Sequence, residues 1–287
     1  MRLLIIICAL LAACGLTAAQ SAAEDSCKAE VFRPVVSAYT VQAGSSHLRD
    51  TYLTPLGYSG WTAGIGYERF QAMKFDPERW IMRLEGSFGL SSGDNPARTA
   101  TMWSIDFTPS WAMMRRFRPA PALTLAAGGI ARGDLGVLYL ARNSNNPASV
   151  KASLTIGATA MATYSVTLGR LPVTLRCQPS FDLLGAFFSP DYDELYYEIW
   201  LGNHSGLCHC AWPGNFVHID NLLTADLRFG ATNLRLGYRF ELLSTKASGI
   251  VSRAVSHRFV IGIATEWLSV HSGRRSIADS RLISAFY

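Results

Sequence analysis

The chain has 287 residues, a formal net charge of +5 and 16% charged residues, whereas an average globular domain carries about 25% charged residues. The mean hydropathy is positive, at +0.16, and no segment after the N-terminal twenty residues is long and apolar enough to span a bilayer as a helix. These values exclude a disordered chain and a helical membrane protein. Six cysteines are too few for a disulfide scaffold, and the small, scattered charge excess argues against nucleic-acid binding.

The N-terminus has the pattern of a secretory signal peptide. A short basic start precedes an apolar run over residues 3–11, and small residues follow up to Ala19. A basic start, an apolar core and a small-residue cleavage site are the parts of such a peptide. We therefore predict a signal peptide over 1–19 and a periplasmic N-terminal segment over 20–33. A lipoprotein signal ending at Cys14 is the alternative, and in either case the chain leaves the cytoplasm.

After Pro34 the sequence alternates between apolar and polar residues with a period of two. In 152–168, Leu154 and Ile156 share one face while Ser153 and Thr155 share the other, and this alternation is long for a soluble strand. We expect about twelve strands, within a range of about 10–14, because bacterial outer-membrane barrels have an even number. The candidate strands are 34–43, 60–72, 79–90, 101–113, 121–131, 152–168, 171–183, 194–203, 220–231, 233–244, 256–269 and 279–287.

The fold class that this pattern favours is all-β: a closed antiparallel transmembrane β-barrel over 34–287. Each strand has the roughly 9–11 residues that a bilayer crossing needs, and Trp and Tyr residues cluster near strand ends, as an interfacial girdle requires. The chain ends on Phe286-Tyr287, which resembles the assembly signal of outer-membrane barrels. A barrel must close because an open sheet edge in hydrocarbon would leave backbone groups without partners. A soluble secreted β-protein is the alternative.

The connections between the candidate strands differ in length. Tight connections near 168–172 and 230–234 are expected to be periplasmic. Long connections, expected to be extracellular, fall near 43–59, 133–151, 184–193, 204–219 and 245–256. Two long connections in succession, 184–193 and 204–219, break the strict up-and-down order. Either a strand between 171 and 220 is missed or invented, or one long segment folds into the periplasmic mouth of the barrel.

The inward faces carry charges of both signs, which indicates salt-bridged side chains in a narrow interior, although passage of a small solute stays open. The candidate lumen charges are Arg176, Glu194, Glu198, Asp226, Arg228, Arg235, Arg239 and Glu241, with Arg83, Glu85, Asp106, Asp182 and Glu266 on the same faces.

The segment 203–221 is the densest in residues that can carry chemistry. It holds half of the six histidines, and a His beside a Ser, with Asn or Asp to orient the ring, is the minimum for an activated hydroxyl nucleophile. In this hydrolase hypothesis Ser205 is the nucleophile, His204 the base, and Asn215 or Asp220 the orienting group.

Asn203-His204-Ser205-Gly206 and Trp212-Pro213-Gly214-Asn215 loosely resemble the Asn-His-x-Ser-x-Gly and Trp-Asn motifs of outer-membrane phospholipase A, a family of twelve-stranded barrels. The resemblance implies hydrolysis of phospholipid or lipid A acyl esters, with calcium as the cofactor. Its His and Ser are two apart and share one strand face, whereas here they are adjacent and would point to opposite faces.

Two further polar segments are candidate ligand-binding loops. Asp50, Tyr52 and Thr54 form an Asp-x-Tyr-x-Thr pattern that faintly resembles outer-membrane lipid A deacylases. Arg142 and Asn143 lie in a polar turn cluster, and such side chains can bind phosphate or sugar.

The cysteines suggest neither a metal nor a settled pairing. Cys208-His209-Cys210, with His204 and His218 nearby, offers soft N and S ligands, but Cys-x-Cys lacks the spacer of a structural zinc site. We assign no metal and no cofactor outside the hydrolase alternative. Cys27 and Cys177 could form a disulfide, which a sequence alone does not prove.

Over most of its mature length the chain resembles an uncharacterised family of Bacteroidetes outer-membrane barrels known as a domain of unknown function. The residues that carry this resemblance are Asp50-Thr51-Tyr52-Leu53-Thr54-Pro55-Leu56, Tyr67-Glu68-Arg69, Asn203-His204-Ser205-Gly206 and Asp220–Leu227. It implies fold and location but no activity. We therefore expect an integral protein of the bacterial outer membrane with a binding, small-solute passage or envelope-structural role. Its expected partners are outer-membrane lipid, lipopolysaccharide and the outer-membrane assembly machinery, and no nucleic acid.

Overall fold

The structure is a computed structural model that describes residues 31–144, 146–192, 195–202, 206–230, 232–267 and 281–285, the last range with only the backbone of 281–282. The signal peptide predicted over 1–19 lies outside the described residues. The chain divides into two units. In the smaller unit, β1 (Val31–Phe32) pairs in parallel with β13 (Arg281–Leu282). The larger unit holds every other strand.

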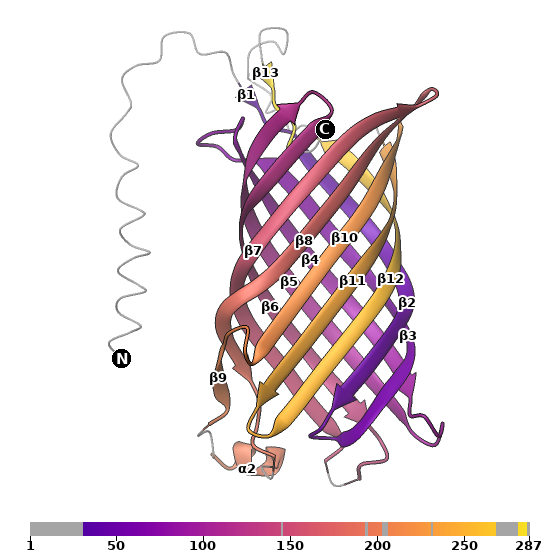
Figure 1. Cartoon of the computed structure of the whole chain (residues 1–287), viewed down its shortest axis with the longest axis vertical. Helices are drawn as coiled ribbons and strands as arrows, with labels where there is room; N and C mark the ends of the chain where they lie inside the picture. The colour runs from indigo at the N-terminus through magenta and orange to yellow at the C-terminus, as the bar shows by residue number, and fades with distance from the viewer. Residues whose placement is uncertain are drawn as a thin grey trace, which may run out of the picture. The chain divides into compact units, whose positions relative to one another are not determined.

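The larger unit forms a closed antiparallel barrel (Figure 1), and ten of its eleven described strands make up the barrel wall. Sequence neighbours pair with each other, and the sheet closes because β12 pairs with β2 and β10 pairs with β8. The strands are β2 (Val35–Asp50), β3 (Thr54–Ala72), β4 (Trp80–Asp94), β5 (Thr101–Ala120), β6 (Leu123–Leu140), β7 (Ala148–Leu168), β8 (Leu171–Phe188), β10 (Phe216–Phe229), β11 (Thr232–Ala247) and β12 (Ile250–Trp267). A short extra strand, β9 (Cys208–Ala211), pairs with the end of β8.

The candidate strand 194–203 is wrong, a second candidate adds no barrel strand in its described part, and the described count falls to the lower end of the expected range. The segment 194–203 contains the helix α2 (Tyr196–Trp200) instead of a strand. The Glu198 carboxylate accepts a hydrogen bond from the Leu195 backbone N–H at 3.0 Å, which closes a helical turn. Removing this strand restores the up-and-down order, because 189–215 becomes one connection from β8 to β10. Within the segment 279–287, the described residues 281–285 add no barrel strand, and the other residues of this segment, Phe286 and Tyr287 among them, lie outside the described residues.

The two ends of the barrel are distinguished by the chain termini and by the connections that lie there. We call the end where β2 starts and β12 finishes the terminus end, and the opposite end, which carries α2, the loop end (Figure 1). The tight connections at 168–172 and 230–234 lie at the terminus end. The expected long loops at 43–59, 133–151 and 245–256 are wrong, since these segments are mostly strand joined by short turns. The strands extend past the regions of clear alternation because their loop-end halves mix small and polar residues on both faces.

The expected distribution of faces is confirmed. On β7, Leu154 is 70% exposed and points outward, whereas Thr155 is 2% exposed and points into the lumen. The same outward apolar surface includes Tyr39, Val41, Ile65, Phe88, Ile105, Leu135, Ile156, Phe259, Ile261 and Ile263. The barrel is therefore apolar outside and polar inside, the reverse of a soluble barrel. Among the described residues, no helix is long and apolar enough to cross a membrane.

Apolar side chains fill the lumen at the terminus end. They come from the inner faces of six strands and from the C-terminal stretch: Val36, Phe70, Ile81, Met114, Ala126, Met161 and Ala285. The guanidinium group of Arg116 holds this stretch by donating to the Ser284 carbonyl at 2.7 Å and the Pro77 carbonyl at 3.0 Å. Residues 283–285 thus close the terminus end instead of forming a last strand.

Candidate functional site in the barrel lumen

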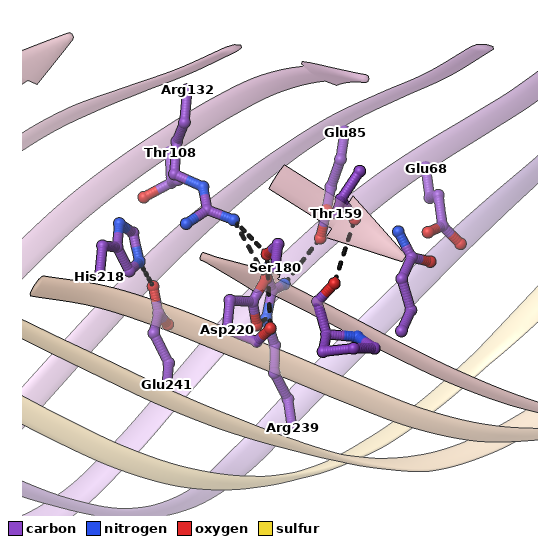
Figure 2. Close-up of polar contacts among 12 residues, drawn as sticks. Glu68, Glu85, Thr108, Arg132, Thr159, Ser180, His218, Asp220, Arg239 and Glu241 are labelled. Carbon is purple, nitrogen blue, oxygen red and sulfur yellow. Dashed lines mark hydrogen bonds and ion pairs between the residues drawn. The ribbon is translucent and has the colours of Figure 1, made fainter. Parts of the chain in front are cut away.

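A continuous set of ion pairs, here called the charged network, lies among the inward-facing side chains of the lumen. Figure 2 shows part of it, from Glu85 and Arg239 through Asp220 to Arg132, with His218 and Glu241 beside it. At its terminus-end side, Arg235 lies 2.7 Å from Asp226 and 2.5 Å from Glu68. Glu68 also accepts from Arg176 at 2.8 Å and lies 4.0 Å from Arg83. One carboxylate from β3 therefore joins arginines from β4, β8 and β11.

The network continues toward the loop end. Glu85 pairs with Arg83 at 3.0 Å and with Arg239 at 2.7 Å. Arg239 donates two hydrogen bonds to Asp220, at 2.8 and 2.7 Å, the fork geometry in which Arg binds carboxylate most strongly. Asp220 lies 3.7 Å from Arg132, the next member of the network.

At the loop-end side the network reaches a buried histidine. Arg132 pairs with Asp182 at 3.1 Å, and His218 Nδ1 lies 3.3 Å from the same carboxylate. His218 Nε2 lies 3.2 Å from Glu241, which also pairs with Arg258. The network thus links seven strands, because period-two alternation directs one residue in two of each strand into the lumen.

Little space remains among these side chains. The void lined by Glu68, Glu85, Arg235 and Arg239 is about 10 Å³, which is about the volume that one water needs. The arginines are almost fully buried, with Arg83, Arg176 and Arg235 each 2% exposed or less. Buried charges are costly unless each is paired, so the interlocked pairs explain how so many charges occupy one narrow lumen.

A cavity of about 110 Å³ lies on the loop-end side of the network. Its apolar lining residues include Leu48, Leu138, Phe187, Phe216, Leu243 and Ala254. Polar side chains also line it: the charged Asp106, Asp134, Glu241 and Arg258 next to the network, and Ser46, Thr62, Ser91, Lys151 and Ser252 elsewhere. An apolar enclosure with a few convergent polar groups is the usual form of a small-ligand site.

A set of contacts that we call the cap joins three connections at the loop end of the barrel. Asn146 donates to the Tyr52 hydroxyl, and Asn143 donates to the Leu53 carbonyl at 3.3 Å. The Tyr196 ring of α2 meets the Tyr52 ring edge-on at a centroid distance of 5.8 Å, and its hydroxyl accepts from the Val150 N–H at 2.7 Å. Burial raises the pKa of Tyr196 to about 12.

Asp50 fixes the cap to the barrel wall. Its side chain is fully buried and accepts from Ser149 at 2.9 Å and from the Tyr52 N–H at 3.0 Å. Lys151 lies 2.6 Å from the same carboxylate. Asp50 therefore joins the β2–β3 turn to β7 through bonds that leave its oxygens facing protein and not solvent.

The candidate loop residues separate into two groups. Asp50, Tyr52 and Asn143 come together in the cap. Thr54 begins β3, where its hydroxyl accepts from the Leu56 N–H at 3.3 Å, and Arg142 is exposed and donates to Thr99 at 2.9 Å. A binding role for these residues stays a prediction.

The four candidate catalytic residues are not brought together within the part of the chain that the structure describes. His204 and Ser205 lie outside the described residues. The Asn215 side chain accepts from the Trp212 N–H at 3.0 Å and donates to the Cys210 carbonyl at 2.9 Å, which forms a turn. Asp220 is in the lumen, bonded to Arg239. The two candidate orienting groups therefore serve a turn and an ion pair.

The candidate lumen charges are placed as follows. Arg176, Asp226, Arg235 and Arg239 are buried in the lumen, and Glu241 lines the cavity. Arg228 continues the inner face of β10 but is exposed at the strand end. Glu198 is exposed on α2, outside the lumen, because its segment is a helix in the β8–β10 connection. Glu194 lies outside the described residues.

Sequence reasoning missed Glu68, Arg132, Asp134 and His218 as lumen residues. Asp134 falls in a segment that was expected to be a loop, and His218 was grouped with the cysteines. The alternation of Arg132 and Asp134 with Ala131 and Gly133 could have identified them. Cys177, Cys208 and Cys210 are exposed free thiols, and Cys27 lies outside the described residues.

Comparisons with known proteins give one family and several distant structures. A family model described as "Protein of unknown function (DUF3316)" matches residues 3–274, and no curated protein matches the chain. The chain is similar to Neisserial surface protein A, with 11% identity and a TM-score of 0.31 over 80% of this chain and 97% of that one. It is similar to the translocator domain of the autotransporter NalP from Neisseria meningitidis, with 12% identity and a TM-score of 0.39 over 90% of this chain and 96% of that one. It is also similar to the transport unit of the autotransporter AIDA-I from Escherichia coli, with 7% identity and a TM-score of 0.39 over 90% of this chain and 97% of that one. These scores are low, so the likenesses carry no argument about function.

Proposed function

The chain belongs to the DUF3316 family of proteins of unknown function, and we propose that it is an integral protein of the bacterial outer membrane whose lumen binds a small amphiphile and does not conduct solutes. The expected membership of a family of unknown function is confirmed. The resemblance to phospholipase A and the Bacteroidetes origin stay predictions.

The outer surface supports a position within a bilayer. The strands have 14 to 21 residues, more than the roughly 9–11 that cross a membrane. Large apolar side chains cover the outside, and Phe259 is 76% exposed. Such a surface is stable against lipid and aggregates in water. The first partner of this barrel is therefore lipid. Lipopolysaccharide and the assembly machinery are the partners that an outer-membrane position would add.

The charged network is the observation that carries the argument against conduction. A channel needs a continuous water-filled path, and about 10 Å³ among the central pairs admits at most about one water. The C-terminal stretch closes the terminus end as well, through the Arg116 bonds to Ser284. Both features favour binding over passage.

The cavity favours an amphiphile as the ligand. Its wall combines apolar side chains such as Leu138 and Phe216 with hydroxyl side chains, and Glu241 and Arg258 present charge at the side nearest the network. A ligand with a short apolar part and a polar head matches both surfaces. The cap contact between Asn146 and Tyr52 joins two connections at the loop end, and we expect a ligand that enters from that side to require the cap to open.

Binding of a fluorescent acyl chain tests the proposal. The refolded barrel in detergent is titrated with dansylundecanoic acid, and we expect saturable binding with blue-shifted emission. Leu243→Trp places a large ring in the cavity, while Leu236→Trp places the same ring on the outer face of the same strand. We expect L243W to abolish binding and L236W to keep it. Equal binding by both variants would mean that the probe sits on the outer surface and would refute the binding proposal.

A further inference from the structure

One group of His and carboxylate side chains in the described lumen has the spacing of a metal site. The ligand atoms of Asp134, Asp182 and His218 all lie within 4.8 Å of one another. His218 Nδ1 lies 3.5 Å from Asp134 Oδ2 and 3.3 Å from Asp182 Oδ2. Two ligands with bonds of about 2.1 Å in a tetrahedral site lie about 3.4 Å apart.

The histidine ring supplies a second, independent observation. His218 is fully buried, and its Nδ1 has no hydrogen-bond partner among the described residues. Nε2 lies 3.2 Å from Glu241 Oε1, and a ring N–H donated to this carboxylate leaves Nδ1 with a lone pair. That lone pair faces two carboxylate oxygens. Three electron-rich atoms that converge in a buried place repel one another unless a positive species lies between them.

The groups around the cluster hold it in position for a cation. Asp134 accepts from Thr108 at 3.1 Å and from Ser153 at 2.7 Å, and Asp182 accepts from Thr155 at 2.7 Å. Hydrogen-bonded carboxylates and a ligand His that donates its other N–H to a carboxylate are the usual surroundings of a protein metal site.

The charges near the cluster sum to a negative value that a divalent cation would neutralise. The described network together with the adjacent Asp106 and Asp134 contains eight carboxylates and six guanidinium groups, so two positive charges are missing while His218 is neutral and Lys151 is paired with Asp50. The carboxylates are Glu68, Glu85, Asp106, Asp134, Asp182, Asp220, Asp226 and Glu241, and the guanidinium groups belong to Arg83, Arg132, Arg176, Arg235, Arg239 and Arg258.

We propose that Asp134, Asp182 and His218 bind one divalent transition-metal ion in the lumen. One imidazole and two carboxylates suit Zn²⁺ or Mn²⁺ better than Ca²⁺, which takes oxygen ligands. Asp134 and Glu241 line the loop-end cavity, so the ion reaches the site from that cavity. The three residues come from β6, β8 and β10, far apart in the chain, so the pattern of the sequence does not group them.

Metal content of the refolded full barrel tests the proposal. The protein is loaded with Zn²⁺, desalted and measured by mass spectrometry, and we expect about one ion per chain. His218→Gln and Asp182→Asn each abolish binding. The control His257→Gln changes an exposed histidine on the outer face and keeps it. Circular dichroism verifies that each variant is folded, and Glu241→Gln, which keeps all three ligands, weakens affinity about 10- to 100-fold.

Cobalt substitution separates this site from the cysteines. Co²⁺ bound by Asp134, Asp182 and His218 gives visible d–d bands and no sulfur-to-metal charge-transfer band. A sulfur band, or loss of the ion in His209→Gln but not in His218→Gln, would place the ion at Cys208 and Cys210 and overturn the proposal. A folded barrel that binds no ion would also overturn it, and His218 would then be an imidazolium held by the carboxylates.

Discussion

The two halves of the lumen differ in how completely side chains fill them. Around Glu68, Arg235 and Arg239, paired charges fill the space and leave a void of about 10 Å³. Around Leu138 and Phe216, apolar side chains enclose a cavity of about 110 Å³. Buried charged side chains must lie in contact with an oppositely charged partner, so they pack closely. Apolar side chains need no such partner, so a cavity can remain between them. The filled half therefore stabilises the barrel, and the open half is available for binding.

The largest effect is expected from unpairing the network. Glu68→Ala leaves Arg176 and Arg235 without one of their carboxylates, and removing one member of a buried pair costs about 3–5 kcal/mol. Urea unfolding in lipid vesicles measures the loss. The exposed Lys74→Ala, in the connection between β3 and β4, is the control and should change the free energy of unfolding by less than about 0.5 kcal/mol. Similar small losses in both variants would show that the network contributes little.

A somewhat smaller effect is expected from the outer face. Ile156 is 60% exposed in the middle of β7, and an arginine on the lipid face near the bilayer centre costs about 2–4 kcal/mol. Ile156→Arg should lower the free energy of unfolding in vesicles by this amount. Unchanged stability in vesicles would contradict a lipid-facing position of β7.

The cap is expected to respond more weakly. Asp50→Asn keeps the shape but removes the charge that pairs with Lys151 at 2.6 Å, at a cost of about 1–3 kcal/mol. Because the loss is local, protease cleavage at the loop end should accelerate while the barrel stays folded. Binding of dansylundecanoic acid should also become faster, because a weaker cap opens more often. Cleavage at the wild-type rate would show that the cap does not depend on this pair.

The smallest effect concerns pH. Burial raises the pKa of Tyr196 from 10.0 to about 12, so its stabilising contribution is complete below pH 10 and is lost as pH rises toward 12. The difference in loop-end protease sensitivity between wild type and Tyr196→Phe should therefore change over this window. A constant difference from pH 9 to 12 would contradict the burial of the Tyr196 hydroxyl in the cap.

The sequence predicted the barrel and the direction of its faces because period-two alternation is a local property. The sequence-based prediction failed where the local pattern favours one structure and the neighbouring elements favour another. The alternation of Leu195, Tyr197 and Ile199 is typical of a strand, yet this segment forms α2 because no neighbouring strand pairs with it.

Prediction of the lumen was partial for a related reason. Alternation identifies the inner residues, such as Arg235 and Arg239, but not which strand supplies each partner. The Glu68–Arg235 pair joins β3 to β11 across the lumen, and only the closed barrel brings these strands face to face. The cluster of Asp134, Asp182 and His218 depends on the same closure and therefore could not be inferred from spacing.

The most direct test of the closed lumen is conductance. The purified barrel is inserted in a planar lipid bilayer, with an open porin measured in the same bilayer as the control. Insertion is verified by recovering the protein from the membrane. We predict no steady ohmic current from the wild-type barrel, because the charged network and residues 283–285 block its lumen. A steady current that scales with salt concentration would contradict the closed lumen and make passage of small solutes the function.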